Sequence, residues 1–273
     1  MKRFLKLMMM AIVFTLPTMF VACDDDDEKE NNGGNDSPEE FVTVKRIKQI
    51  RGFDVEEDET GEQNLNYDEK GRISSLSQDD QDIMTISYEY PDSIIIEIPK
   101  RAFHCHIDEN NRIDVYYEYD LDDETIDTLE LAYNEAGYLI GVNNGEDFAE
   151  YEGGNLLKCG FNNIEYSKSY FSTMTYTEYK NNFWGIDINF LMASTEWLAC
   201  MGMDGGYLLP ALGFMGKLSE NLMATEKDNG SSNVYNYLYE FNTDGDVVKV
   251  TVKKNEEIIY IYEFTYEMVQ IKK

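Results

Sequence analysis

The chain holds two histidines, which stand two residues apart in the segment His104-Cys105-His106. If this segment is a β-strand, alternate side chains share a face, so His104, His106 and Asp108 point to one side. Two imidazoles and a carboxylate on one face suit a divalent transition metal. The spacing also arises by chance, and no third histidine exists to complete a site. These residues are the candidate metal site of the chain, and the sequence predicts no cofactor.

Aromatic residues give a second candidate site in an apolar stretch of the chain. An aromatic platform for a sugar or a peptide is one reading, and aromatic residues of a buried core are the other. The sequence leaves both readings open for Trp184, Trp197, Tyr207 and Phe214.

Catalytic motifs are weak. The two histidines share one predicted strand, so no Ser-His-Asp or Cys-His arrangement is credible, and no nucleophile elbow is present. The segment 242–246 (Asn-Thr-Asp-Gly-Asp) is similar to a calcium loop, but an EF-hand needs Glu six residues past the glycine, where Thr251 stands. A hairpin turn is the better interpretation of this segment. A hydrolase is therefore the third-ranked reading, behind two non-enzymatic ones.

The first residues have the layout of a secretory signal. Lys2, Arg3 and Lys6 precede an apolar run over residues 7–20, which is shorter than the ~20 residues needed to cross a bilayer. The run ends in Phe-Val-Ala-Cys at Cys23, which resembles a bacterial lipobox. That resemblance implies cleavage of residues 1–22, acylation of Cys23 and attachment to a membrane through the lipid anchor. An ordinary signal peptide with an incidental cysteine is the alternative.

An acidic, polar segment spans residues 23–40, with four aspartates directly after Cys23. It cannot bury apolar surface, so we expect a disordered tether. In Bacteroidetes-type lipoproteins, acidic residues directly after the lipidated cysteine act as a surface-export signal. The resemblance implies an outer-membrane lipoprotein exposed at the cell surface, with a periplasm-facing location as the alternative.

Charge and cysteine content limit the remaining classes. The formal net charge is −30, and removal of residues 1–22 takes away three basic residues and no acidic residue. So acidic a chain repels the phosphates of nucleic acids, which excludes them as partners. Cys105, Cys159 and Cys200 are an odd number, so they cannot all pair with one another, and buried free thiols are expected.

One turn recipe recurs along the chain. The best copy is residues 133–142 (Tyr-Asn-Glu-Ala-Gly-Tyr-Leu-Ile-Gly-Val), in which a strand ends, the chain turns on Gly137 and a new strand begins. An Asp or Asn side chain stabilises such a turn, and Gly or Asn takes its left-handed position. The other expected left-handed positions are Gly71, Asn111, Gly154 and Gly245. Because their spacing is uneven, a solenoid is excluded and a mainly β, antiparallel meander is predicted.

The β character is interrupted near residues 183–223. Asp187 is a candidate N-cap for a helix, and residues 217–223 are expected to form a second short helix. We expect this insert to pack over one face or end of the sheet. Residues 41–273 are therefore interpreted as a single antiparallel β domain with a short helical insert.

Taken with its closing hairpin at residues 235–245, the chain resembles a Bacteroidetes-type lipoprotein family of unknown function with a porin-like fold. The resemblance covers about residues 41–266 and brings no catalytic residues. It implies a barrel, and because the strands lack an outward apolar band, we expect a soluble barrel or strongly curved sheet. A surface lipoprotein that binds a glycan or a peptide ranks first among the functions. A structural or adhesive partner-binding protein ranks second.

Overall fold

The computed structural model describes residues 41–90, 92–142, 147–163, 167–193 and 208–272. The predicted signal and tether, Trp197, Tyr207 and Cys200 lie outside these residues. In the described part of the chain, no helix is long and apolar enough to cross a membrane.

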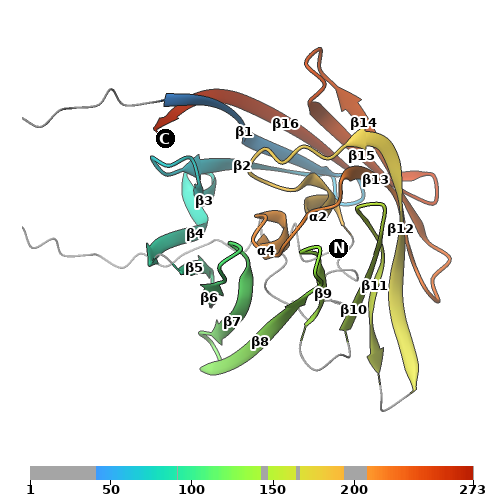
Figure 1. Cartoon of the computed structure of the whole chain (residues 1–273). Coiled ribbons are helices and arrows are strands. Elements are labelled where there is room, and N and C mark those ends of the chain that lie inside the picture. Colours follow the sequence, from blue (N-terminus) through green and yellow to red (C-terminus); the bar gives the residue numbers. More distant parts are fainter. Residues whose placement is uncertain (1–40, 91, 143–146, 164–166, 194–207, 273) are drawn as a thin grey trace, which may run out of the picture.

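The fold is a single antiparallel sheet that curves round into a nearly closed barrel (Figure 1). Its strands follow one another in chain order, and β1 pairs with β16, which joins the two ends of the described chain. The sixteen strands of the described residues are β1 (Phe41–Asp54), β2 (Glu59–Tyr67), β3 (Ile73–Gln78), β4 (Gln81–Tyr90), β5 (Ser93–Ile98), β6 (Arg101–Ile107), β7 (Ile113–Asp120), β8 (Thr125–Tyr133), β9 (Leu139–Val142), β10 (Asp147–Glu152), β11 (Asn155–Asn163), β12 (Lys168–Lys180), β13 (Asn221–Asp228), β14 (Val234–Phe241), β15 (Val247–Lys254) and β16 (Glu257–Lys272).

The recurrent turn forms as predicted. Gly71, Gly137 and Gly245 have φ values of 78°, 90° and 86°, and Asn111 takes the same left-handed region at 60°. Each of these turns leads from an even-numbered to an odd-numbered strand, as does the turn at Gly154. In an up-and-down sheet such turns lie at one end of the barrel, which we call the glycine-turn end.

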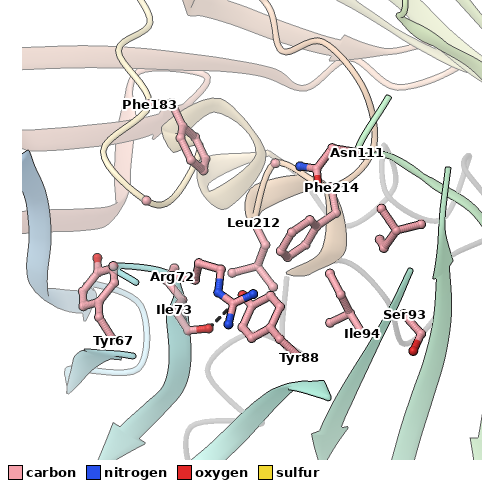
Figure 2. Close-up of a pocket in the computed structure, with 14 residues that line it drawn as sticks. Tyr67, Arg72, Ile73, Tyr88, Ser93, Ile94, Asn111, Phe183, Leu212 and Phe214 are labelled. Carbon is pink, nitrogen blue, oxygen red and sulfur yellow. Dashed lines mark hydrogen bonds between the residues drawn. The ribbon is translucent and has the colours of Figure 1, made fainter. Parts of the chain in front are cut away.

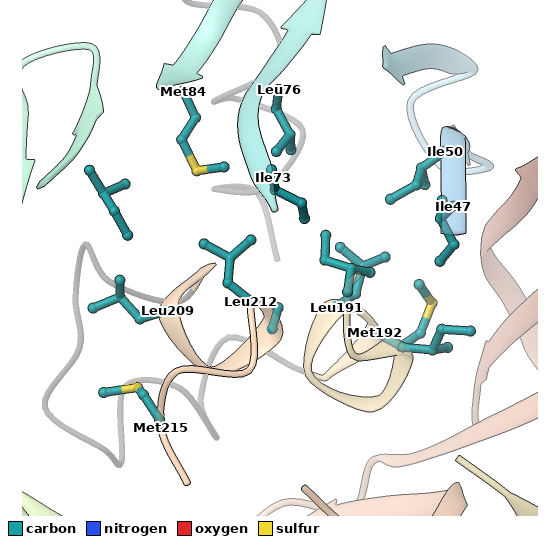
Figure 3. Packing of buried hydrophobic residues seen from close by; sticks show 14 of the residues in the cluster. Ile47, Ile50, Ile73, Leu76, Met84, Leu191, Met192, Leu209, Leu212 and Met215 are labelled. Carbon is teal, nitrogen blue, oxygen red and sulfur yellow. The ribbon is translucent and has the colours of Figure 1, made fainter. Parts of the chain in front are cut away.

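Two short helices, α2 (Ile188–Met192) and α4 (Leu208–Ala211), lie inside the ring of strands and form a plug (Figure 1). Asp187 is the N-cap of α2, as predicted, and its carboxylate accepts a hydrogen bond of 2.8 Å from the amide of Phe190. Figure 3 shows Ile47, Ile50, Ile73, Leu76 and Met84 of the wall directed toward the apolar side chains of the plug. Burial of these side chains attaches the plug to the wall.

The ends of the sheet order, β9 and β10, lie side by side and form a seam (Figure 1). At the glycine-turn end, Tyr138 and Tyr151 stack across it with ring centroids 4.5 Å apart. Residues 216–220 cross beneath the seam: the amide of Lys217 donates to the carbonyl of Gly137, and that of Glu220 to the carbonyl of Gly154. The chain after the plug thus holds the seam together.

The outer wall carries many polar side chains. On β2, buried Gly61, Gln63 and Leu65 alternate with exposed or half-buried Thr60, Glu62 and Asn64. Polar pairs also join neighbouring strands, namely Gln49–Glu62, Asn66–Ser75, Thr85–Glu97 and Thr175–Thr225. These polar pairs differ from the continuous apolar band that a lipid-facing wall carries.

One local prediction was wrong. Residues 217–223 form no helix, since Asn221 begins β13, which pairs with β12 and β14. Residues 53–64, although acidic, contain the end of β1 and the start of β2. Gly61 pairs with Gly52 inside the sheet, because cross-strand pairing outweighs the acidic composition of the segment.

Candidate functional site

The site begins with the turn that joins β2 to β3. The Asp68 carboxylate accepts hydrogen bonds from the backbone amides of Lys70 (3.0 Å) and Arg72 (2.8 Å). The same carboxylate binds the Arg72 side chain, with Nε at 2.8 Å and Nη2 at 2.6 Å. Burial raises the pKa of Asp68, but these hydrogen bonds outweigh it and hold the pKa below its usual value. Asp68 is therefore ionised at neutral pH.

Tyr88 on β4 fixes the other side of Arg72. The guanidinium carbon lies 3.8 Å from the ring centroid of Tyr88, which is a cation–π geometry. The Tyr88 hydroxyl donates to the carbonyl oxygen of Ile73 at 2.9 Å, and burial raises its pKa to about 12. Tyr88 is thus a neutral hydrogen-bond donor that positions Arg72.

A cavity of about 340 Å³ opens beside this pair, between the wall and the plug (Figure 2). This is near the lower end of the roughly 300–1,000 Å³ usual for small-molecule sites. The wall contributes Arg72, Tyr88 and Ile94. The segments next to the two helices of the plug contribute Phe183, Leu212 and Phe214. The remaining lining residues are Tyr67, Gly71, Ile73, Ser93, Ile107, Asn111, Gly185 and Gly213.

Glycines let the plug approach the wall closely at the cavity. Gly185 has φ 93°, and a Cβ atom there would lie 2.8 Å from the hydroxyl of Tyr67. Gly213 has φ 80°, and its Cβ would lie 3.0 Å from the ring of Phe183. Any other residue at these positions would be strained and would push Phe183 or Tyr67 away. The shape of the cavity thus depends on both glycines.

Polar groups at the cavity are available to a ligand. In the described part of the chain, Arg72 Nη1 has no protein hydrogen-bond partner, since Nε and Nη2 alone contact Asp68. The side chain of Asn111 likewise forms no hydrogen bond with the described residues. Phe183 adds an aromatic surface at the rim, with 44% of the residue exposed. The cavity therefore combines hydrogen-bonding groups with aromatic and aliphatic walls.

The structure separates the predicted aromatic platform. Phe214 lines the cavity, with its ring centroid 6.3 Å from that of Tyr88. Trp184 lies outside the lining and packs against the core, with Lys45 Nζ 5.8 Å from its ring centroid. Trp197 and Tyr207 lie outside the described residues.

The predicted metal ligands are placed differently. His104 and His106 are exposed on β6, His104 lies against the ring of Tyr119, and His106 Nδ1 is 2.5 Å from the carboxylate of Asp114. Asp108 is bound by Arg112 within its own turn. Within the described ranges, no group of three His, Cys, Asp or Glu side chains is arranged to hold a metal ion.

Sequence reasoning missed Arg72, Tyr88, Asn111 and Phe183 as site residues. One signal was present, because Arg72 and Arg112 each follow the left-handed residue of a turn that begins with aspartate. The same Asp–Arg contact forms in both turns. The sequence did not predict where the plug lies. The plug places Arg72, and not Arg112, beside a cavity.

Comparisons with known proteins support the barrel fold but do not identify a function. No protein-family model and no curated protein matches the sequence. Among solved structures, the chain is similar to one described as a porin-like protein from Bacteroides uniformis, with a TM-score of 0.60 and 13% identity. The match covers 81% of this chain and 96% of that one. At this identity the likeness shows the porin-like barrel fold alone.

Proposed function

We propose that the protein is a lipid-anchored, surface-exposed component of the outer membrane that binds a ligand, a glycan or a peptide, in the cavity beside Arg72. The lipobox at Cys23 supports the lipid anchor, and the acidic segment after it supports the location at the cell surface. The polar side chains of the outer wall support a barrel that stands in water beside the membrane, so that the lipid is its means of attachment.

The cavity is the observation that carries the proposal. It is bounded by rigid elements, because Arg72 is fixed by Asp68 and Tyr88 while the plug is held by the core. It also brings aromatic side chains together with polar groups that have no partner in the described structure. Concave sites of this composition are typical of small-ligand binding.

Ligand binding is tested on the mature chain with Cys23→Ser, which removes the lipid and leaves the rest of the protein intact. We expect this protein to capture members of a glycan or peptide array, and Phe183→Ala at the rim to weaken capture at least tenfold. Tyr117→Ala is the matched control, because Tyr117 is an aromatic residue with similar exposure (42%) on β7 that does not line the cavity. Equal capture by both variants would reject the cavity as the site.

The membrane attachment and the surface location are tested separately in cells. Replacement of Cys23 by Ser should release the protein from the membrane fraction, because acylation needs the thiol. External protease should digest the wild-type barrel on intact cells. A barrel that is protected until the outer membrane is broken would instead favour the periplasm-facing location.

A further inference from the structure

We infer that the cavity beside Arg72 takes a neutral sugar unit of an uncharged glycan and discriminates against acidic sugars and charged peptides. This inference rests on the proposed ligand site and specifies its chemistry.

Charge balance is the first reason. Arg72 is the one formally charged residue among the 14 described residues that line the cavity. Its guanidinium is matched by the Asp68 carboxylate at 2.6 Å, so the pair has no net charge. A carboxylate on a ligand would have to compete with Asp68, in a chain whose net charge of −30 repels anions. A cationic ligand, although the same net charge attracts it to the chain, would meet the guanidinium of Arg72 in the cavity. Neither sign of charge is favoured.

The hydrogen-bonding groups are the second reason. Arg72 Nη1 supplies N–H donors in a direction fixed by the stack on Tyr88 and by Asp68. Asn111 supplies an amide, which both donates and accepts. Sugar hydroxyls also donate and accept, so they can satisfy this mixed set without bringing a charge.

The remaining walls suit the apolar face of a sugar ring. Phe183 and Phe214 stand on the plug side, and Figure 2 shows Leu212 between Phe183 and Tyr88, with Ile94 of the wall near Phe214. The face of Tyr88 is already covered by Arg72, so the stacking surface comes from the two phenylalanines. Aromatic rings pack against the C–H face of a pyranose, and a small cavity limits the bound part to a short unit.

The test compares a neutral hexose trisaccharide with a trisaccharide of the corresponding uronic acid, titrated by calorimetry into the mature chain with Cys23→Ser. We expect the neutral sugar to bind at least tenfold more tightly than the uronate. Asp68→Asn should narrow this ratio by raising affinity for the uronate, because Arg72 then has no counter-charge. The turn tolerates the change, since Asn134 and Asn242 occupy the same position in two other turns.

Asp108→Asn is the matched control, because it breaks the identical Asp–Arg pair in the β6–β7 turn, and neither Asp108 nor Arg112 lines the cavity. It should leave both affinities unchanged. The inference would be overturned if the protein with Asp68 and Asp108 intact bound the uronate as tightly as the neutral sugar or more tightly. It would also be overturned if Asp68→Asn left the ratio of the two affinities unchanged. Neutral-sugar binding that is insensitive to Phe183→Ala would also overturn it.

Failure of the inference is distinct from failure of the ligand site. If a peptide or an acidic sugar binds and Phe183→Ala abolishes that binding, the site stands and its proposed chemistry is wrong. If no glycan or peptide responds to Phe183→Ala, the site itself is wrong.

Discussion

The hydroxyl of Tyr133 on β8 donates a hydrogen bond of 2.5 Å to the carbonyl oxygen of Ile113 on β7, while the guanidinium of Arg112 lies 4.2 Å from the same ring. The unit recurs at Arg46-Ile47 with Tyr67 and at Arg72-Ile73 with Tyr88. Without the arginine, the tyrosine bond also forms at Tyr176, Tyr239 and Tyr266. A repeated tyrosine–carbonyl bond thus ties strand pairs together near the glycine-turn end.

Removal of the Tyr133 hydroxyl should destabilise the barrel. In Tyr133→Phe the carbonyl of buried Ile113 loses its side-chain donor, and leaving such a group unsatisfied costs about 1–3 kcal/mol. Thermal or urea unfolding measures the loss. Tyr117→Phe is the control, because Tyr117 is exposed on the outer wall, and its change should stay within about 0.5 kcal/mol. Equal stability of both variants would show that the bond contributes nothing.

The turns and strand β13 differ in how far the sequence could predict them. The left-handed positions at Gly71, Asn111 and Gly137 were predicted, because an Asx side chain binds the backbone only two to four residues away. The first residues of β13 (Asn221–Asp228) were instead predicted as helix. This strand forms by pairing with β12 and β14, and the local sequence pattern does not show that pairing.

The candidate site shows the same division. The Asp68–Arg72 pair is local and its residue types are visible in the sequence. The cavity exists only because residues 183–185 and 212–214 come to lie beside β3 and β4. No local pattern encodes that contact, and so Phe214 was predicted as a ligand residue while Phe183, its neighbour in the cavity, was not.

Gly245→Ala isolates the cost of a left-handed backbone. Nothing lies within 4 Å of the Cβ that alanine would add at Gly245, so the φ of 86° is the source of strain. We expect a loss of about 1–2 kcal/mol in the free energy of unfolding. Asn111→Ala is a second test, because Asn111 holds φ 60° and alanine lacks the side chain that tolerates it. Unchanged melting of both variants would show that these turns relax freely.

Asp187 should make stability depend on pH. Burial raises its pKa from 3.8 to about 6, against hydrogen bonds from Phe190 and Asn181 that lower it. Because the folded pKa is the higher one, the folded state binds the proton more tightly. Its contribution is present below about pH 4 and is lost as pH rises through 6. Asp187→Asn removes the charge, so the unfolding free energy of the variant relative to wild type should rise between these pH values, by up to roughly 3 kcal/mol.

Asparagine keeps the N-cap acceptor for Phe190. The Asn181 amide would need to rotate, and its Oδ1, which has no partner among the described residues, could then accept from the new amide. Chemical denaturation at several pH values gives the comparison. A difference between the two proteins that does not change with pH would show that Asp187 titrates normally.

His106 should titrate above the ordinary range for histidine. Its hydrogen bond to Asp114, aided by the charges of Asp114, Asp92 and Asp108, raises the pKa of the imidazole. Asp114→Asn should lower that pKa toward 6.5, as followed by NMR of the ring protons. His104 provides the internal reference in the same spectra, because it contacts Tyr119 rather than Asp114. An unchanged His106 pKa in the variant would show that the contact does not persist in solution.

Gly216→Ala tests whether the segment beneath the seam holds the barrel together. A Cβ at Gly216 would lie 2.6 Å from the carbonyl oxygen of Gly137 and 2.8 Å from the ring of Tyr133, and φ is 84°. The variant therefore combines backbone strain with a clash against the turn it must bind, whereas Gly245→Ala has the strain alone. We expect a loss clearly larger than the about 1–2 kcal/mol predicted for Gly245→Ala. Amide exchange should also quicken at Lys217, whose hydrogen bond to Gly137 lies at the clash. A loss equal to that of Gly245→Ala, with protection at Lys217 retained, would show that the seam does not depend on this contact.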